Sequence, residues 1–272
     1  MIRLLTDSNS QIPAEIRQRF SVDVVPMTVV VDGEPLFEGV DLDLAGITAA
    51  LQRGAAVSSS TPSPGQFLQA YQRAADEGVT EILSVHTGGE VSAVANVARI
   101  AAGMASIPVE VVDTGSASFP VAMCTWVAGE VLAGGGTVAD AAEAALRTAT
   151  QVGNVFIVGT PALAARGGRL AEGVDPTGIP VLALADGAMR AVGRVTDVTA
   201  AVDALAAYVV DQAAGARLRI GVGQLAALVL ADALEEALRG CCDIEQLIRY
   251  DVGPSVAVHT GLGTVGCVFH PV

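Results

Sequence analysis

Two kinds of hydrophobic pattern alternate through the first half of the chain. Short apolar runs rich in β-branched residues predict strands at residues 2–5, 22–31, 81–86 and 109–112. Between them, apolar residues recur every three to four positions and predict helices at residues 13–19, 44–53, 64–77, 91–102, 117–133 and 138–150. Strands that alternate with helices favour a mainly parallel sheet with crossover helices on its faces.

The pattern changes after three consecutive glycines at residues 134–136 and a further glycine at 153. It then predicts a strand at 155–158, a short helix, and two strands joined at Asp186-Gly187, a pair typical of hairpin turns. The remaining elements we expect are helices at 198–213 and 225–239 and strands at 218–222, 244–250, 255–258 and 265–269. We therefore predict an α/β protein of two domains, residues 1–152 and residues 153–272.

Composition and charge exclude several classes of function. The chain is 51% hydrophobic but only 4% aromatic, which suits a large aliphatic core. Its formal net charge is -14 and it contains no lysine, so nucleic acid and anionic membranes are disfavoured as partners, and neither a Schiff base nor a P-loop lysine is possible. The chain starts without a basic leader and has no uninterrupted apolar run of about 18 residues. We expect a cytoplasmic protein without stable membrane association.

Cysteines and histidines do not have the spacing of metal ligands. The four cysteines include the adjacent pair Cys241-Cys242, which is poorly placed for a structural disulfide, and no C-x-x-C occurs. The three histidines, His86, His259 and His270, are scattered. We expect reduced thiols, no metal and no cofactor.

Four polar stretches follow apolar segments, where open α/β sheets place their ligand-binding groups. They begin at Thr6, Ser58, His86 and Asp113. Each could simply cap the helix after it, because Ser, Thr and Asp are preferred N-caps. Their recurrence after successive predicted strands nevertheless indicates a common site at one edge of the sheet.

The segment Arg166-Gly167-Gly168-Arg169 sets two guanidinium groups around a turn that lets the backbone approach a ligand closely. It indicates an anion site, although arginines at the end of a helix can equally pair with surface acids. His259 could likewise be a structural residue, a half-buried histidine at the end of a strand, and not a ligand contact.

Two motifs suggest other functions. Residues 221–226 read Gly-Val-Gly-Gln-Leu-Ala and resemble a dinucleotide-binding fingerprint between a strand and a helix. Residues 253–257 fall short of the nucleophile-elbow pattern at their last position, and nothing combines a phosphate cradle with metal-binding carboxylates. Hydrolytic and kinase activities are therefore unsupported, and a nucleotide site stays an alternative.

An ordered set of short segments runs along nearly the whole chain, at residues 6–8, 25–27, 39–43, 59–65, 113–118, 167–170 and 259–261. Through this set the chain resembles the DegV family of bacterial fatty-acid-binding proteins. This resemblance implies a two-domain α/β fold with an acyl chain in a pocket between the domains. The best-known members of this family serve as the lipid-carrying subunit of a fatty acid kinase, so the resemblance implies a long-chain fatty acid as ligand and a kinase as partner.

The resemblance also implies which residues hold the carboxylate. They are hydroxyls of the loop containing Ser59 and Ser60, the loop at Gly89, and the side chains of Arg169 and His259. Two features depart from the family pattern: Gly88-Gly89 replaces a pair of serines, and the segment between Arg169 and Pro180 is shorter. The first removes a direct hydroxyl, and the second leaves acyl-chain length and docking of the kinase open.

The function we expect is that of a lipid-binding carrier without catalytic machinery of its own. It would present a fatty acid for phosphorylation and hold the acyl phosphate. One alternative is a DegV-fold protein repurposed as an enzyme or sensor for another small anion or a nucleotide. A second is a regulatory module without a ligand.

Overall fold

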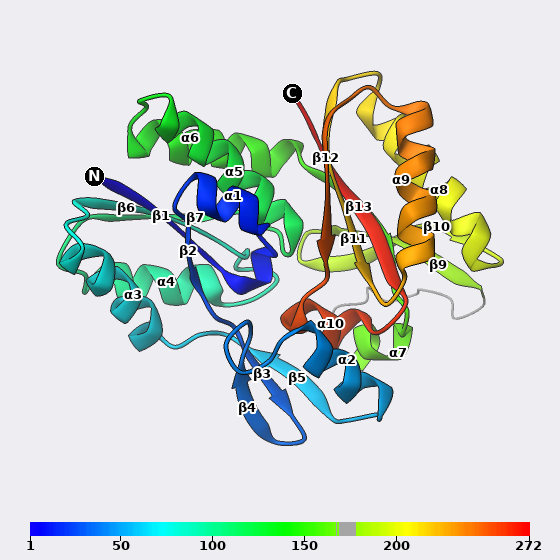
Figure 1. Ribbon diagram of the computed structural model, residues 1–272, viewed down its shortest axis with the longest axis horizontal. Coiled ribbons are helices and arrows are strands. Elements are labelled where there is room, and N and C mark those ends of the chain that lie inside the picture. The colour runs from blue at the N-terminus through cyan, green and yellow to red at the C-terminus, as the bar shows by residue number, and fades with distance from the viewer. Residues whose placement is uncertain (167, 169–177) are drawn as a thin grey trace.

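A parallel sheet forms the core of the N-terminal part of the chain in the computed structural model, which describes residues 1–166, 168 and 178–272 (Figure 1). Its four strands lie in the order β2 (Asp23–Val25), β1 (Ile2–Asp7), β6 (Glu81–His86) and β7 (Val109–Asp113). The register pairs Asp7 with Val25 and His86 with Asp113. Because all strands are parallel, the carboxyl ends of β1, β6 and β7 meet at one edge of the sheet.

Helices cover both faces of this sheet, as the alternation of side chains along each strand requires. Leu5 and Ile82 pack against α3 (Pro64–Asp76) and α4 (Val94–Ala102), whereas Leu4 and Leu83 pack against α5 (Phe119–Ala133) and α6 (Val138–Gln151). The short η1 (Ser8–Ser10) and α1 (Ala14–Arg19) follow β1. The predicted parallel sheet with flanking helices is confirmed.

A mixed sheet forms the core of the C-terminal part. Its order is β10 (Ala188–Val195), β9 (Ile179–Ala185), β8 (Gly153–Ile157), β13 (Thr264–Pro271), β11 (Leu218–Leu225) and β12 (Ile244–Asp251), in which only β11 and β12 pair in parallel. Helices α8 (Val198–Ala213) and α9 (Leu228–Cys241) bury their apolar faces against it, and α7 (Pro161–Arg166) follows β8. Among the described residues no helix is both long enough and apolar enough to cross a bilayer.

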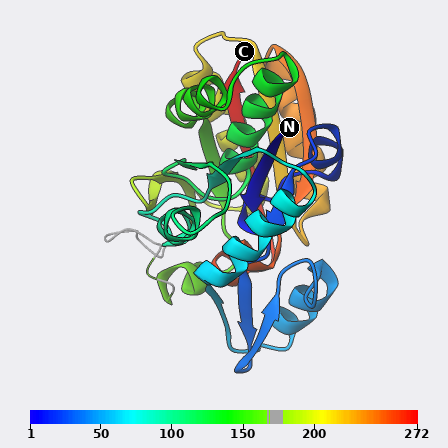
Figure 2. The ribbon, with the colours of Figure 1, turned by 90° about the vertical axis from the view of Figure 1, so that its left-hand side faces the viewer.

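A third, antiparallel sheet projects at one end of the molecule, at the bottom of Figures 1 and 2. It consists of β4 (Glu34–Phe37), β3 (Thr28–Val31) and β5 (Val57–Ser60), with α2 (Leu44–Gln52) beside it. Here the sequence prediction was wrong in two ways. The run at 22–31 is two strands in different sheets, separated around Pro26, which lacks a backbone donor. The polar stretch beginning at Ser58 is strand up to Ser60 and loop only from Thr61 to Ser63.

The small sheet packs against α10 (Pro254–Thr260), which comes from the other end of the chain. Val29 and Ile47 share one apolar cluster with Ala257 and Val258 of this helix. The prediction of a strand at 255–258 was wrong, because Pro254 stands in the first helical turn, where its missing N–H costs nothing. The domain boundary expected at residue 152 stays a prediction. This apolar cluster contains residues from both sides of that boundary.

The segment that resembles a dinucleotide-binding fingerprint, residues 221–226, does not form a turn between a strand and a helix at its glycines. Residues 221–226 lie in β11 and just beyond it, and α9 begins only at Leu228. A Cβ atom at Gly221 would lie 2.4 Å from the ring of Phe119, and one at Gly223 would lie 2.3 Å from the ring of Tyr250. These glycines therefore make room for two stacked aromatic rings of the core, not for a phosphate.

Candidate functional site

A cavity of about 130 Å³ lies between the parallel sheet and the six-stranded sheet. The residues that line it are mostly apolar and come from both halves of the molecule, including Met27, Val91, Pro120, Val155, Phe156, Leu184, Met189, Tyr250, Val252, Val256, Cys267 and Val268.

Ser59 and His259 meet in this cavity although they are 200 residues apart in sequence. Ser59 lies on β5 and His259 lies near the end of α10, and the packing of α10 on the small sheet brings them together. The Ser59 Oγ atom is 2.9 Å from His259 Nε2. A hydroxyl and an imidazole can both donate hydrogen bonds to an anion, so this pair is suited to an acidic head group.

The other predicted contacts are placed differently. Ser60 is exposed on the opposite side of β5, and neither it nor Gly89 is among the residues that line the cavity. Arg169 lies outside the described residues, and Arg166 is exposed at the end of α7. The roles of Ser59, Ser60, Gly89, Arg169 and His259 toward a carboxylate remain predictions.

The loop after β6 is held by the carboxylate of Asp113. The Gly89 N–H donates to both oxygens of Asp113, at 3.1 and 3.2 Å, and the Arg99 guanidinium lies 3.5 Å from the same carboxylate. Further along the loop, Ser92 lines the cavity, and its Oγ atom lies 3.2 Å from Thr61 Oγ1. The loop therefore presents Ser92, and not Gly89, to the cavity.

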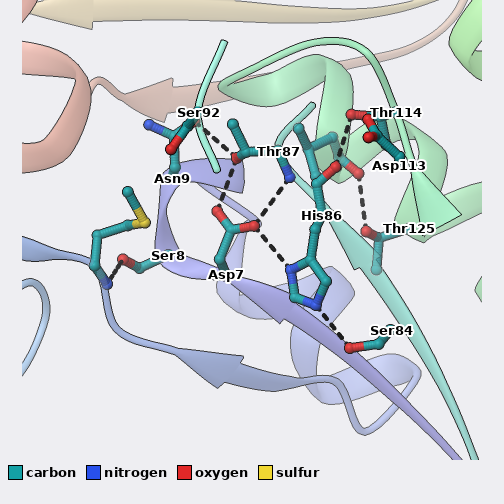
Figure 3. Close-up of polar contacts among 12 residues, drawn as sticks. Asp7, Ser8, Asn9, Ser84, His86, Thr87, Ser92, Asp113, Thr114 and Thr125 are labelled. Carbon is teal, nitrogen blue, oxygen red and sulfur yellow. Dashed lines mark hydrogen bonds and ion pairs between the residues drawn. The ribbon is translucent and has the colours of Figure 1, made fainter. Parts of the chain in front are cut away.

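A buried network fixes the carboxyl ends of β1 and β6 (Figure 3). The Asp7 carboxylate accepts from the Thr87 N–H at 3.0 Å and the Thr87 hydroxyl at 2.9 Å, and it lies 2.9 Å from His86 Nδ1. His86 Nε2 is 2.6 Å from Ser84 Oγ. This Ser-His-Asp arrangement resembles a catalytic triad, but all three side chains are fully buried and out of reach of a substrate.

The network instead positions polar groups of the cavity wall. Asn9 follows Asp7 in the chain, accepts from the Ser118 N–H at 3.0 Å and donates to Ser255 Oγ at 3.2 Å. Asn9, Thr87, Ser118 and Ser255 all line the cavity. Sequence reasoning gave none of these residues a role of its own, although Thr87 belongs to the polar stretch that begins at His86 and Asn9 directly follows the one that begins at Thr6.

The aromatic and thiol groups in the cavity wall are neutral. Burial raises the pKa of the Tyr250 phenol and of the Cys267 thiol far above their usual ranges. Tyr250 also stacks on Phe119 with the ring centroids 4.4 Å apart. This part of the wall therefore presents uncharged surface to a guest.

A second, more open cleft of about 400 Å³ lies beside the first cavity. At its base, the buried Glu38 carboxylate accepts from the Ser8 hydroxyl and from the Ser255 N–H at 3.0 Å. Burial raises the pKa of Glu38, while these hydrogen bonds oppose the rise. Ser8 Oγ also accepts from the Met27 N–H at 2.9 Å. Because Met27 and Ser255 line the first cavity, Glu38 and its partners form the wall between the two spaces.

Within the described part of the chain, no group of three or more His, Cys, Asp or Glu side chains is placed to hold a metal ion. The four cysteines are free thiols.

The family model and the most similar curated proteins both identify the DegV family. A family model for the DegV family matches residues 1–272. A DegV domain-containing protein of Streptomyces coelicolor is 33% identical over 276 residues, which cover 98% of this chain and 97% of the relative. A DegV domain-containing protein of Mycobacterium tuberculosis is 30% identical, with 97% and 96% covered.

Solved structures show the same fold. A DegV family protein from Thermus thermophilus, described as fatty acid binding, superposes with a TM-score of 0.92 at 30% identity, covering 100% of this chain and 99% of its own. DegV of Bacillus subtilis, a fatty acid binding protein, superposes with a TM-score of 0.89 at 20% identity, with 100% and 99% covered. The predicted mixed α/β architecture is confirmed.

Proposed function

Because the chain belongs to the DegV family, we propose that it binds a long-chain fatty acid in the cavity between its two large sheets. The carboxylate lies at Ser59 and His259 in this proposal, with Arg169 as a further donor. The observation that carries it is the Ser59–His259 pair, which places two potential donors in the wall of a mostly apolar cavity.

The energetics favour such a ligand. A buried carboxylate is costly unless donors satisfy its lone pairs, and a hydroxyl, an imidazole and a guanidinium can supply charge-assisted hydrogen bonds. The tail supplies most of the driving force, roughly 0.8 kcal/mol per buried methylene, or about 12 kcal/mol gross for about sixteen carbons before association costs. An aliphatic wall with neutral Tyr250 and Cys267 accommodates that tail.

We further propose that the protein is a cytoplasmic carrier that presents its fatty acid to a separate kinase and then holds the acyl phosphate. Two observations favour a carrier over an enzyme. The Ser84–His86–Asp7 arrangement is closed off from substrates, and the glycines at 221 and 223 contact aromatic rings. The second observation also removes the main support for a nucleotide site.

Mass spectrometry of lipid extracted from the purified protein tests the proposal directly. We expect a fatty acid in nearly stoichiometric amount, and a rise in melting temperature when the delipidated protein is given fatty acids. Recovery of no acyl species, together with no thermal shift by fatty acids, would contradict the proposal. Stabilisation by nucleotides alone would favour the alternative enzyme or sensor.

The substitution Ser59→Ala tests the head-group contact. Loss of a hydrogen bond to a charged group costs about 1.5–3 kcal/mol, so we expect fatty acid affinity to fall by about tenfold to hundredfold. Ser106→Ala is the matched control, because Ser106 is exposed and bonds only weakly to Gln72, at 3.4 Å, far from the cavity lining. Equal affinities for the two variants in a fluorescent fatty acid titration would remove Ser59 from the site.

A further inference from the structure

Cys241 and Cys242 place two thiols side by side at the connection between α9 and β12, at the end of the molecule opposite the small sheet (Figure 1). Their sulfur atoms are 3.7 Å apart. Cys241 is exposed and Cys242 is half-buried, whereas the other two cysteines of the chain are buried. Neither residue lines the cavity or the second cleft, so the proposed binding of a fatty acid gives this pair no role.

The backbone on both sides of the pair is fixed by packing. Leu238, one helical turn earlier, is fully buried in the core of the six-stranded sheet, and Cys242 packs against the same cluster. The Cys242 N–H donates to the Leu238 carbonyl at 2.9 Å where the helix ends, and the Asp243 carbonyl accepts from the Leu218 N–H at 2.8 Å. The two thiols are therefore held in place without a ligand, which lowers the entropic cost of a ligand that bridges them.

A disulfide between these two thiols is unfavourable. The peptide bond that joins them is trans, so their Cα atoms lie about 3.8 Å apart, below the roughly 4.4–6.8 Å that a disulfide usually spans. Burial and the neighbouring Cys241 thiol raise the pKa of the Cys242 thiol to about 11. At neutral pH Cys242 is therefore not the thiolate that oxidants attack. The pair is suited to remain a reduced dithiol.

The spacing of the two sulfur atoms selects the kind of centre that both could bind. With bonds of about 2.3 Å, as in zinc thiolates, two sulfurs on one centre lie about 3.7 Å apart at a tetrahedral angle and about 4.6 Å apart at a linear one. The observed 3.7 Å fits a bent pair of bonds. Zinc and iron–sulfur sites use four protein ligands, but among the described residues no third His, Cys, Asp or Glu joins the pair. Trivalent arsenic forms bent bonds to sulfur and needs only two protein thiols, because its third bond goes to an oxygen or carbon group of its own.

We propose that Cys241 and Cys242 form a binding site for trivalent arsenic, in which both sulfurs bond to one arsenic atom. With phenylarsine oxide as ligand, both S–H bonds and the As=O bond break, two As–S bonds form, and the oxygen leaves as water with the two thiol protons. Arsenic stays trivalent, so the step consumes no oxidant or reductant. The site is independent of the proposed fatty acid, since neither thiol lines the cavity.

Binding of phenylarsine oxide to the reduced full-length chain tests the proposal, with intact-mass spectrometry to count the arsenic retained in excess monothiol. We expect wild type to keep one phenylarsine group per chain and to release it to a competing dithiol. In Cys241→Ser and in Cys242→Ser only one attachment point is left. We expect their retention against the monothiol to fall by about a hundredfold or more, because the second bond no longer forms within the same molecule.

Cys241→Ser is the deciding variant, because Cys241 is exposed and its replacement is expected to leave the melting temperature unchanged. Thermal melts identify any variant that fails to fold. Retention by Cys241→Ser equal to that of wild type, or complete release from wild type by the monothiol, overturns the proposal. The double variant Cys241→Ser/Cys242→Ser keeps the buried Cys124 and Cys267 and is expected to retain no arsenic. Retention by this double variant would place the arsenic on a buried thiol and would also overturn the proposal.

Discussion

His270 is a buried histidine on β13. The residue is only 7% exposed, and neither ring nitrogen has a hydrogen bond to the described part of the chain. Burial lowers the pKa of His270 below its ordinary value of about 6.5, and the positive charge of Arg219 lowers it further, while the negative charge of Glu130 opposes them. The folded protein therefore favours the neutral imidazole.

This lowered pKa gives His270 a defined effect on stability. As the pH falls through about 6.5, the unfolded chain takes up a proton at this position before the folded protein does, so the free energy of unfolding decreases. Above about 6.5 both states are neutral and the effect vanishes. We expect His270→Gln to lose less stability than wild type between about pH 7.5 and pH 5.5, measured by urea unfolding. A difference between the two proteins that stays constant with pH would contradict this.

The sequence identified some residues of the cavity wall but could not tell which neighbouring side chains face the cavity. Ser59 and His259 were found through the family resemblance, and the structure places them 2.9 Å apart. Ser60 could not be distinguished from Ser59, because a strand that reads Val-Ser-Ser-Ser has no apolar alternation to show which side chains face inward. Ser92 was not singled out, because its position in the cavity wall depends on how the loop after β6 packs against the end of β7, which the sequence pattern does not reveal.

At the scale of elements, α10 connects the C-terminal part of the chain to the small sheet and to η1. Its entry point, Gly253, donates its N–H to Gln11 Oε1 at 2.7 Å. A Cβ atom at this position would lie 2.4 Å from the same Gln11 atom and 2.8 Å from Glu38 Oε1. The glycine is required by this close approach, because its backbone angles are open to any residue.

We expect Gly253→Ala to destabilise the protein by about 1–3 kcal/mol, because the added methyl group forces Gln11 and Glu38 away. It should also weaken fatty acid binding, since α10 carries His259. Gly240→Ala in α9 is the matched control, because a Cβ there meets nothing within 4 Å. That variant should be neutral or stabilised by up to about 1 kcal/mol. Equal unfolding midpoints for the two variants in urea would show that the entry to α10 is not tightly packed.

Helices and strands were predicted correctly where a long segment has a clear apolar period. The prediction failed for short segments whose structure depends on packing against distant parts of the chain. The helices of the parallel sheet were predicted to within about three residues, since their apolar faces and caps are local properties. The apolar run Val-Ala-Val in α10 was taken for a strand because three residues fit either period. The small sheet was missed because each of its strands is only four residues long, and β4 and β5 are partly polar.

At the scale of the whole molecule, α5 joins the two large sheets. Its residues Phe119 and Trp126 share an apolar cluster with Ile248 of β12 and Val268 of β13. The Arg219 guanidinium lies 4.8 Å from the ring of Trp126 and pairs with Glu130 at 2.6 Å. Trp126 is the only tryptophan of the sequence and is 1% exposed, so its fluorescence reports on this junction.

We expect urea unfolding followed by Trp126 fluorescence and by far-UV circular dichroism to give the same midpoint, because shared clusters make the two halves unfold together. Fatty acid at about 100 times its dissociation constant should stabilise the protein by about 2.7 kcal/mol and move both midpoints equally. A fluorescence change at lower urea than the loss of secondary structure would show that the halves separate first.

The contacts that build the site join the two ends of the chain. The Asn9–Ser255 bond spans 246 residues, the Glu38–Ser255 bond 217 and the Ser59–His259 contact 200. Such contacts close very long loops and form after local structure in folding. During synthesis, the N-terminal residues of the site exist long before residues 253–260 leave the ribosome. Under the proposed function, the fatty acid can therefore be bound only after residues 253–260 have been synthesised, and a truncated chain that lacks α10 would leave Ser59 without its contact to His259.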